Sequence, residues 1–232
     1  MSEMSIAQKK YLQQQLRYRQ MIKYSRIFIF ALFLIAWECA ACFQFIDSFI
    51  FSSPSKIVQC FYTMLLNDAL LTHIGITLLE TLISFLLVLF CALAITIFLW
   101  FHQGISAALE PCLVVLNSLP KSALAPLLIV WLGANFKTII VTGMSVAIFG
   151  TILSLYTAFQ SVDAEKIKLI YTLGGTKKHV MTKVILPSNI PTLFSLMKVN
   201  IGLCLVGVII GEFIASKSGL GYLIIYGSQV FR

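Results

Sequence analysis

The residues of this sequence that could carry chemistry are scattered acidic side chains, a lysine between prolines, three histidines and six cysteines. Acid–base catalysis would need His, Asp or Glu side chains gathered at one depth of the fold. Four candidate carboxylates instead lie in different apolar runs with no histidine beside them: Glu38, Glu80, Glu110 and Glu212. The sequence therefore predicts no active site and favours binding or conduction over catalysis.

The histidines and cysteines also form no predicted metal site. His102 ends an apolar run, and no other histidine or suitable cysteine stands at ligand spacing from it. Cys39 and Cys42 form a C-x-x-C pair, but inside a predicted membrane helix, where cysteine acts as a small apolar residue. The chain has no Walker A pattern, so we expect no ATP site and no cofactor in it.

The composition is that of a polytopic membrane protein. Hydrophobic residues make up 59% of the 232 residues and charged residues only 11%, against about 25% charged in soluble domains. We predict an all-α integral membrane protein with spans at about 27–46, 74–101, 106–132, 138–160 and 190–212. Lysine and arginine concentrate in 9–26 and 166–183, which favours a cytoplasmic segment 1–26 before a membrane domain 27–232. The net charge of +8 thus reflects topology rather than nucleic acid binding.

The run 106–132 is the best candidate for a translocation path. It contains Pro111, Pro120 and Pro126, and prolines free carbonyls that neighbouring helices or pathway water must satisfy. Lys121 would lie inside the bilayer, either as a positive point for an anion or paired with a carboxylate such as Glu80. The predicted path residues are Asn117, Pro120, Lys121, Asn200 and Glu212.

Three further local features can be predicted. Glu38, near the middle of the first span, should face other helices or be protonated. The stretch 51–72 should form an amphipathic helix on the outer surface. Gly143 and Gly150 are seven residues apart, which favours a seam of close helix packing.

The segment 161–189 is the one long polar stretch between spans, and we call it the elbow. Its first half predicts a helix with Val162, Leu169, Ile170 and Leu173 on one face. Gly174 and Gly175 break that helix, and a second amphipathic turn runs to Pro187. The pattern predicts two short helices at an angle, protruding into the cytoplasm.

Three motif blocks, in order, resemble the permease subunits of binding-protein-dependent ABC importers. The elbow has Gly174, nine residues, Val184, Leu186 and Pro187. The run 117–133 has the core P-K-S-A-L-A-P-L, and 211–223 has an acidic residue before a Gly-Leu-Gly-Tyr turn. The likeness is greatest to nitrate-, sulfonate- and taurine-type permeases. Two departures stand out: the family's usual Glu-Ala-Ala is Lys-Leu-Ile here, and we expect five spans in place of the usual six, in a short variant or a truncated protein.

The resemblance implies a type I importer-like helical bundle in which the elbow is a coupling helix. It implies a pair of separate ATPase subunits that bind ATP and Mg, an extracytoplasmic substrate-binding protein, and a second permease copy. The protein would be a non-catalytic, multi-pass subunit of a prokaryotic inner membrane, surrounded by lipid, with its N-terminus in the cytoplasm and five spans. The implied ATPase contacts are Tyr171, Thr172, Leu173, Gly174, Gly175, Thr176, Lys177, Lys178, His179, Leu186 and Pro187.

Other functions stay open on the sequence. The same subfamily imports pyrimidine precursors of thiamine and other heterocycles, so the cargo need not be a small anion. A secondary transporter would need midplane carboxylates for a coupling ion and usually an inverted repeat, which the sequence lacks. A passive membrane scaffold would not need a bent polar elbow beside proline-broken spans.

Overall fold

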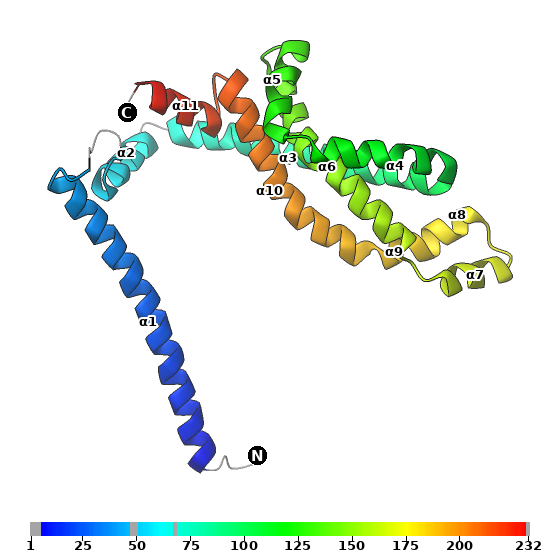
Figure 1. The fold of residues 1–232 in the computed structure, drawn as a ribbon, viewed down its shortest axis with the longest axis horizontal. Helices are drawn as coiled ribbons and strands as arrows, with labels where there is room; N and C mark the ends of the chain where they lie inside the picture. Colours follow the sequence, from blue (N-terminus) through cyan, green and yellow to red (C-terminus); the bar gives the residue numbers. More distant parts are fainter. Residues whose placement is uncertain (1–5, 47–50, 67–68, 231–232) are drawn as a thin grey trace. The chain divides into compact units, whose positions relative to one another are not determined.

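The computed structural model describes residues 6–46, 51–66 and 69–230, and every regular element in these ranges is a helix (Figure 1). The chain divides into two compact units, 1–68 and 69–232. The first unit holds α1 (Ile6–Cys42) and α2 (Pro54–Leu66). The second unit holds, in chain order, α3 (Ala69–Phe101), α4 (Gln103–Ser118), α5 (Lys121–Leu132), α6 (Phe136–Gln160), α7 (Ala164–Thr172), α8 (Lys177–Val180), the π-helical turn η1 (Met181–Ile185), α9 (Leu186–Ser188), α10 (Ile190–Ala215) and α11 (Leu220–Val230).

The first unit joins the basic segment and the first apolar run in one helix. α1 has 37 residues, because Gln, Lys and Arg are good helix formers and no Gly or Pro interrupts them. Residue 26, where the predicted cytoplasmic segment ends, lies within this helix. Glu38 of α1 accepts hydrogen bonds from the backbone N–H of Ser55 at 3.1 Å and from its hydroxyl at 2.7 Å. These bonds hold the start of α2, the helix expected within 51–72.

The second unit is built around α3, α6 and α10, which pack closely on one another. The contact between α6 and α10 is so tight that a Cβ added to Gly207 would lie 2.9 Å from the Cα of Gly143. Gly143 therefore belongs to a close-packed seam. Gly150 differs, since its Cα faces the side-chain oxygen of Asn117 on α4. The two glycines thus allow close approach to different neighbours.

Among the described residues, four helices are long and apolar enough to cross a membrane: residues 17–42 of α1, 70–101 of α3, and all of α6 and α10. The expected crossing 106–132 is not one helix but two, α4 and α5, bent by 98°. The break falls at Leu119 and Pro120, both in extended conformation. A residue before proline is driven out of the helical region by the proline ring. Pro111 and Pro126 remain inside α4 and α5.

The C-terminal turn leads into another helix that the sequence did not predict. α10 ends at Ala215, the chain turns through Gly219 with a φ of +101°, and α11 begins at Leu220. The predicted Gly-Leu-Gly-Tyr turn therefore supplies both the end of the turn and the first residues of α11.

Candidate functional site

Local hydrogen bonds fix the two helices of the elbow at an angle. The carboxylate of Asp163 caps α7 by accepting from the N–H of Glu165 at 2.9 Å. Gly174 ends this helix with a φ of +78°, a conformation that L side chains rarely adopt. The N–H of Thr176 then donates to Nδ1 of His179 at 3.1 Å and starts α8. The glycine break and the second helix therefore lie at the positions that the sequence predicts.

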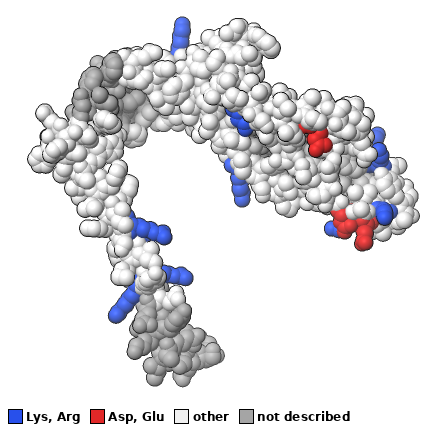
Figure 2. Space-filling model, viewed as in Figure 1, with Lys and Arg blue, Asp and Glu red and all other residues white. Residues whose placement is uncertain are grey.

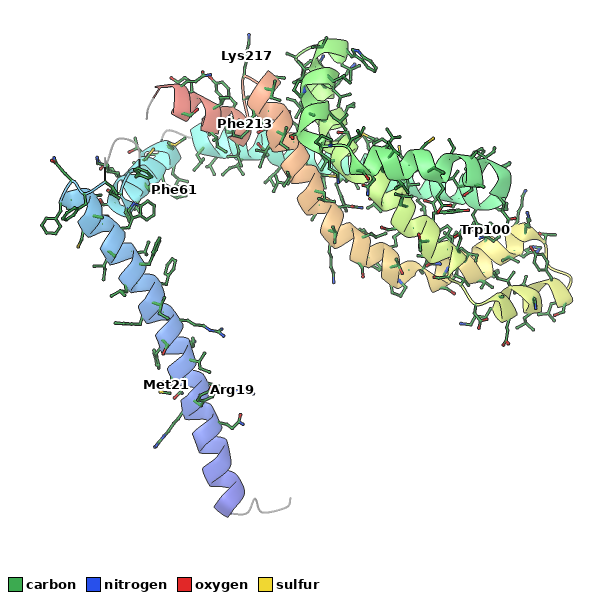
Figure 3. The ribbon with its side chains drawn as sticks, viewed as in Figure 1. Arg19, Met21, Phe61, Trp100, Phe213 and Lys217 are labelled. Carbon is green, nitrogen blue, oxygen red and sulfur yellow. The ribbon has the colours of Figure 1, made fainter. Side chains whose placement is uncertain are left out.

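An apolar cluster, which we call the elbow root, fixes the elbow to the membrane helices. Phe159, Val180, Met181 and Ile185 are all at most 3% exposed and pack together. Half-buried side chains from α3, α7, α9 and the loop before α7 surround them: Leu93, Ile97, Trp100, Phe101, Val162, Ile167, Ile170 and Leu186. Figure 3 shows Trp100 where the end of α3 meets the elbow. Val180, Met181 and Ile185 lie in α8 and η1, so the second half of the elbow is anchored by its apolar face.

The outer surface of the elbow exposes apolar and basic side chains together. Leu173 is 77% exposed, Leu169 58% and Tyr171 44%. Lys177, Lys178 and His179 are exposed as well, and Figure 2 shows charged side chains of both signs at this end of the second unit. The expected single face of α7 is thus divided, with Val162 and Ile170 in the root and Leu169 and Leu173 outside. Leu186 also belongs to the root rather than to the exposed surface.

The predicted path residues fall into two groups. Asn117, Pro120 and Lys121 lie together at the break between α4 and α5, where Lys121 is the first residue of α5. The residue before α5 is Pro120, whose side chain does not cap the first amides of the helix. Asn200 and Glu212 lie instead inside the helix packing, 2% and 0% exposed. Asn200 accepts a hydrogen bond from the Thr151 hydroxyl of α6 at 3.0 Å, which gives it a neighbour within the bundle.

Glu212 is the centre of a buried polar network that we call the latch. Its carboxylate accepts from the Thr77 hydroxyl at 2.7 Å and from the N–H of Gly221 at 2.6 Å. The Thr77 hydroxyl in turn accepts from the N–H of Leu220, and Nδ1 of His73 accepts from the N–H of Gly219, both at 2.8 Å. The latch therefore ties the turn before α11 to the start of α3.

Two latch residues, His73 and Thr77, were not among the predicted site residues. Thr77 and Glu212 are 135 residues apart, and no periodicity or motif in the sequence pairs them. Glu80, one turn further along α3, lies beside Glu212. One Glu80 carboxylate oxygen is buried without a hydrogen-bond partner among the described residues.

The helices, the elbow and the C-terminal turn can now be compared with known proteins. Residues 89–231 match the family described as binding-protein-dependent transport system inner membrane component. The chain belongs to this family. It is a multi-pass inner-membrane protein and a permease subunit of an ABC transporter.

Curated relatives agree on the class of protein and differ in the solute that they name. The chain is 29% identical to a probable ABC transporter permease protein of Haemophilus influenzae, over 87% of this chain and 82% of the relative. It is 25% identical to the formylaminopyrimidine transport permease protein ThiX of Halalkalibacterium halodurans, over 83% and 76%. It is 26% identical to the putative aliphatic sulfonates transport permease protein SsuC of Bacillus subtilis, over 86% and 72%.

Within the part of this permease that the structure describes, no three His, Cys, Asp or Glu residues are grouped so that they could hold a metal ion. All six cysteines are free thiols, and Cys39 and Cys42 are exposed. His102 stacks on the Phe98 ring at 4.5 Å between centroids, and its Nδ1 lies 3.0 Å from the Phe98 carbonyl oxygen. These contacts give His102 a local structural role at the end of α3.

Proposed function

We propose that this permease forms the path of an importer for small anionic solutes of the sulfonate type. A pair of separate ATPase subunits, which bind ATP and Mg, would dock on the elbow in the cytoplasm. A substrate-binding protein would deliver cargo at the outer face, and a second copy of this chain would complete the path. The observation that carries the proposal is an elbow with an exposed apolar surface on a buried apolar root, in a chain of this family.

The elbow is suited to transmit force between a partner and the membrane helices. Leu169 and Leu173 offer an exposed apolar contact, while Val180 and Ile185 are fixed against Phe159 and the end of α3. A partner that pushes on the exposed leucines would therefore move α3 and α6 with the elbow. A nucleotide-driven partner shifts the path between two conformations only if it binds one of them more tightly, by about 1–3 kcal/mol in typical allosteric couplings.

The docking surface can be tested by introducing one negative charge on it and, as a matched control, the same charge outside it. Leu173→Glu places a charge on the exposed leucine, and we expect loss of ATPase copurification and of solute-stimulated ATP hydrolysis with normal insertion. Ser161→Glu adds the same charge at an exposed position outside the predicted contact set and should retain both. If the ATPase copurifies fully with the Leu173→Glu permease, the elbow is not the docking site.

The preference for anionic cargo rests on Lys121 and on the start of α5. Lys121 is half-buried at the break between the two helices, and its ammonium adds to the positive end of a helix whose first amides lack a side-chain cap. Helix N-termini with this polarity bind phosphate, sulfate and carboxylate groups. The relative named for aliphatic sulfonates supports the same class of cargo.

Import of a heterocycle is the second candidate, because one relative is named for formylaminopyrimidine. The two cargoes can be separated by uptake measurements in cells that carry the complete transporter. Lys121→Met removes the charge and keeps the length of the side chain. We expect it to abolish uptake of a sulfonate at unchanged expression, whereas uptake of a neutral pyrimidine should be retained. Undiminished sulfonate uptake in Lys121→Met would show that the lysine has no part in the path.

A further inference from the structure

A cavity of about 440 Å³ lies beneath the elbow, where the end of α3, the start of α4, the end of α6, α7 and α8 meet. Its volume falls within the range of small-molecule sites, about 300–1,000 Å³. Its lining includes one acid, one base, two amides and four aromatic rings, namely Glu110, Lys177, Gln103, Gln160, Trp100, Tyr156, Phe159 and Tyr171. Only Tyr171 and Lys177 belong to the proposed ATPase contacts, so most of this cavity has no assigned role.

An apolar groove of about 570 Å³ continues the cavity along α4. The groove shares Ala107 and Glu110 with the cavity and then passes Pro111, Val114 and Val115. These positions, together with Gln103, recur every three or four residues and form one face of α4. From Gln103 to Val115 this face is about 18 Å long at 1.5 Å per residue, a little more than half of a hydrocarbon core of about 30 Å. The combined site is polar at one end and apolar along the rest.

The charges of the polar end match a zwitterion. Within the described part of the chain, neither the Glu110 carboxylate nor the Lys177 ammonium has a hydrogen bond or ion pair. A ligand with a primary amine could donate to Glu110 and to the amide oxygens of Gln103 and Gln160, since an ammonium offers three donors. The Trp100 ring would add a cation–π contact. A phosphate group beside the amine would meet Lys177.

We propose that the cavity and the groove bind one phospholipid with an ethanolamine headgroup from the cytoplasmic leaflet. The headgroup occupies the cavity and an acyl chain follows the apolar face of α4. The assignment of the leaflet rests on the proposed function, in which the elbow is cytoplasmic. A choline headgroup has no N–H to donate, and a headgroup without an amine leaves Glu110 unpaired. A serine headgroup has the amine but adds a carboxylate beside Glu110, so the site selects ethanolamine lipids. Such a lipid contacts α4 and the elbow at once.

Trp100 provides a direct reporter, because it lines the cavity. The variant Trp37→Phe/Trp131→Phe leaves Trp100 as the sole tryptophan of the full chain. Its fluorescence is measured in phosphatidylcholine vesicles to which acyl-brominated phosphatidylethanolamine or brominated phosphatidylcholine is added. We expect the ethanolamine lipid to be favoured about tenfold at Trp100, the effect of one hydrogen bond to a charged group. Glu110→Gln should reduce this preference towards unity, and Lys177→Gln should weaken it.

Lys166→Gln is the matched control, since Lys166 is an exposed elbow lysine that does not line the cavity, and it should retain the preference. Equal quenching by both lipids, or a preference that survives Glu110→Gln, overturns the proposal. Absence of quenching by either lipid means that a second copy or another protein covers the cavity, which also overturns it. If the tryptophan variant does not insert, native mass spectrometry of the wild-type chain can replace the fluorescence measurement. It then compares how much phosphatidylethanolamine and how much phosphatidylcholine remain bound to the protein. ATPase copurification is a separate readout, so failure of this site and failure of the proposed function are distinguishable.

Discussion

The two ends of α3 hold their neighbours by different physical means. At the end that carries Trp100, the elbow root buries Val180 and Ile185 with apolar side chains alone. At the other end, Thr77 joins Glu212 and the turn before α11 through hydrogen bonds between buried polar groups. The 23 residues from Thr77 to Trp100 span about 35 Å of helix, so the root and the latch lie near opposite ends of a helix long enough to cross a bilayer. Figure 3 shows the labelled residues Trp100 and Lys217, near the root and the latch, far apart in the second unit.

This difference implies different responses to movement. Apolar burial is non-directional, so the root can stay intact while the elbow tilts by a small angle. Hydrogen bonds weaken steeply as their geometry departs from the optimum, and Thr77 and Glu212 are both 0% exposed, so water cannot replace the bonds between them. The latch therefore favours one arrangement of α3, α10 and α11, whereas the root would transmit motion between the elbow and the helices in the proposed function. Substitutions that act on one region and leave the other intact test this distinction.

The largest effect is expected from emptying the elbow root. Phe159 is 1% exposed, and Phe159→Ala leaves a cavity that costs about 3–5 kcal/mol in the free energy of unfolding. The cavity loosens the elbow from α3, so ATPase activity should no longer respond to solute. Thermal unfolding of the purified permease and solute-stimulated ATP hydrolysis measure the two consequences.

Phe194→Ala is the control for this substitution, because Phe194 is 58% exposed and its removal creates no internal cavity. We expect it to be within about 0.5 kcal/mol of the wild type, as surface substitutions usually are. A Phe159→Ala protein that unfolds like the Phe194→Ala protein would show that the root does not fix the elbow.

The next largest effect is expected from Gly219→Ala in the latch. Gly219 has a φ of +101°, and an added Cβ would overlap the carboxylate of Glu212. The left-handed backbone costs about 1–2 kcal/mol and the overpacking about 1–3 kcal/mol, so we expect a total of about 2–5 kcal/mol. Hydrogen exchange should rise in α11 and at the start of α3. Unchanged exchange there would contradict the assignment of the turn to the latch.

A smaller loss is expected from Thr77→Val, which keeps the shape of the side chain and removes the hydroxyl. The N–H of Leu220 loses its acceptor and Glu212 loses one donor, at a cost of about 1–3 kcal/mol for a buried unpaired group. Thr157→Val is the matched control, since the Thr157 hydroxyl is exposed and donates to the Leu153 carbonyl one turn earlier in the same helix. Denaturation in detergent compares the two, and equal midpoints would indicate that the latch bonds add nothing to stability.

The contrast between the regions also explains what the sequence could predict. The elbow is marked by local signals, because Gly174 and Gly175 end α7 and the apolar spacing from Val180 to Ile185 identifies the anchored face. The division of α7, with Leu173 outside and Ile170 inside, depends on contacts with α3 that the local pattern does not contain. The latch depends on residues 135 positions apart, so Glu212 could be identified by its motif but not paired with Thr77.

The broken crossing illustrates the same limit. The sequence contained three prolines in the run 106–132 and so predicted an irregular segment. Only Pro120 separates two helices, while Pro111 and Pro126 are accommodated within α4 and α5. Proline is tolerated in membrane helices where neighbouring groups satisfy the freed carbonyls. Which proline breaks the helix therefore depends on tertiary packing, which composition and spacing do not report.

The smallest effect is expected from Gly174→Ala, the same substitution as in the latch but placed in the elbow. Gly174 also has a positive φ, of +78°, yet no atom lies within 4 Å of an added Cβ. The cost is therefore the backbone strain alone, about 1–2 kcal/mol, and ATPase copurification should be retained. Thermal unfolding of the Gly174→Ala and Gly219→Ala permeases is measured side by side. The difference between their losses of stability gives the cost of the overlap with Glu212. If Gly174→Ala and Gly219→Ala destabilise the permease equally, the Glu212 carboxylate moves aside at no cost. The latch would then be no more rigid than the elbow turn.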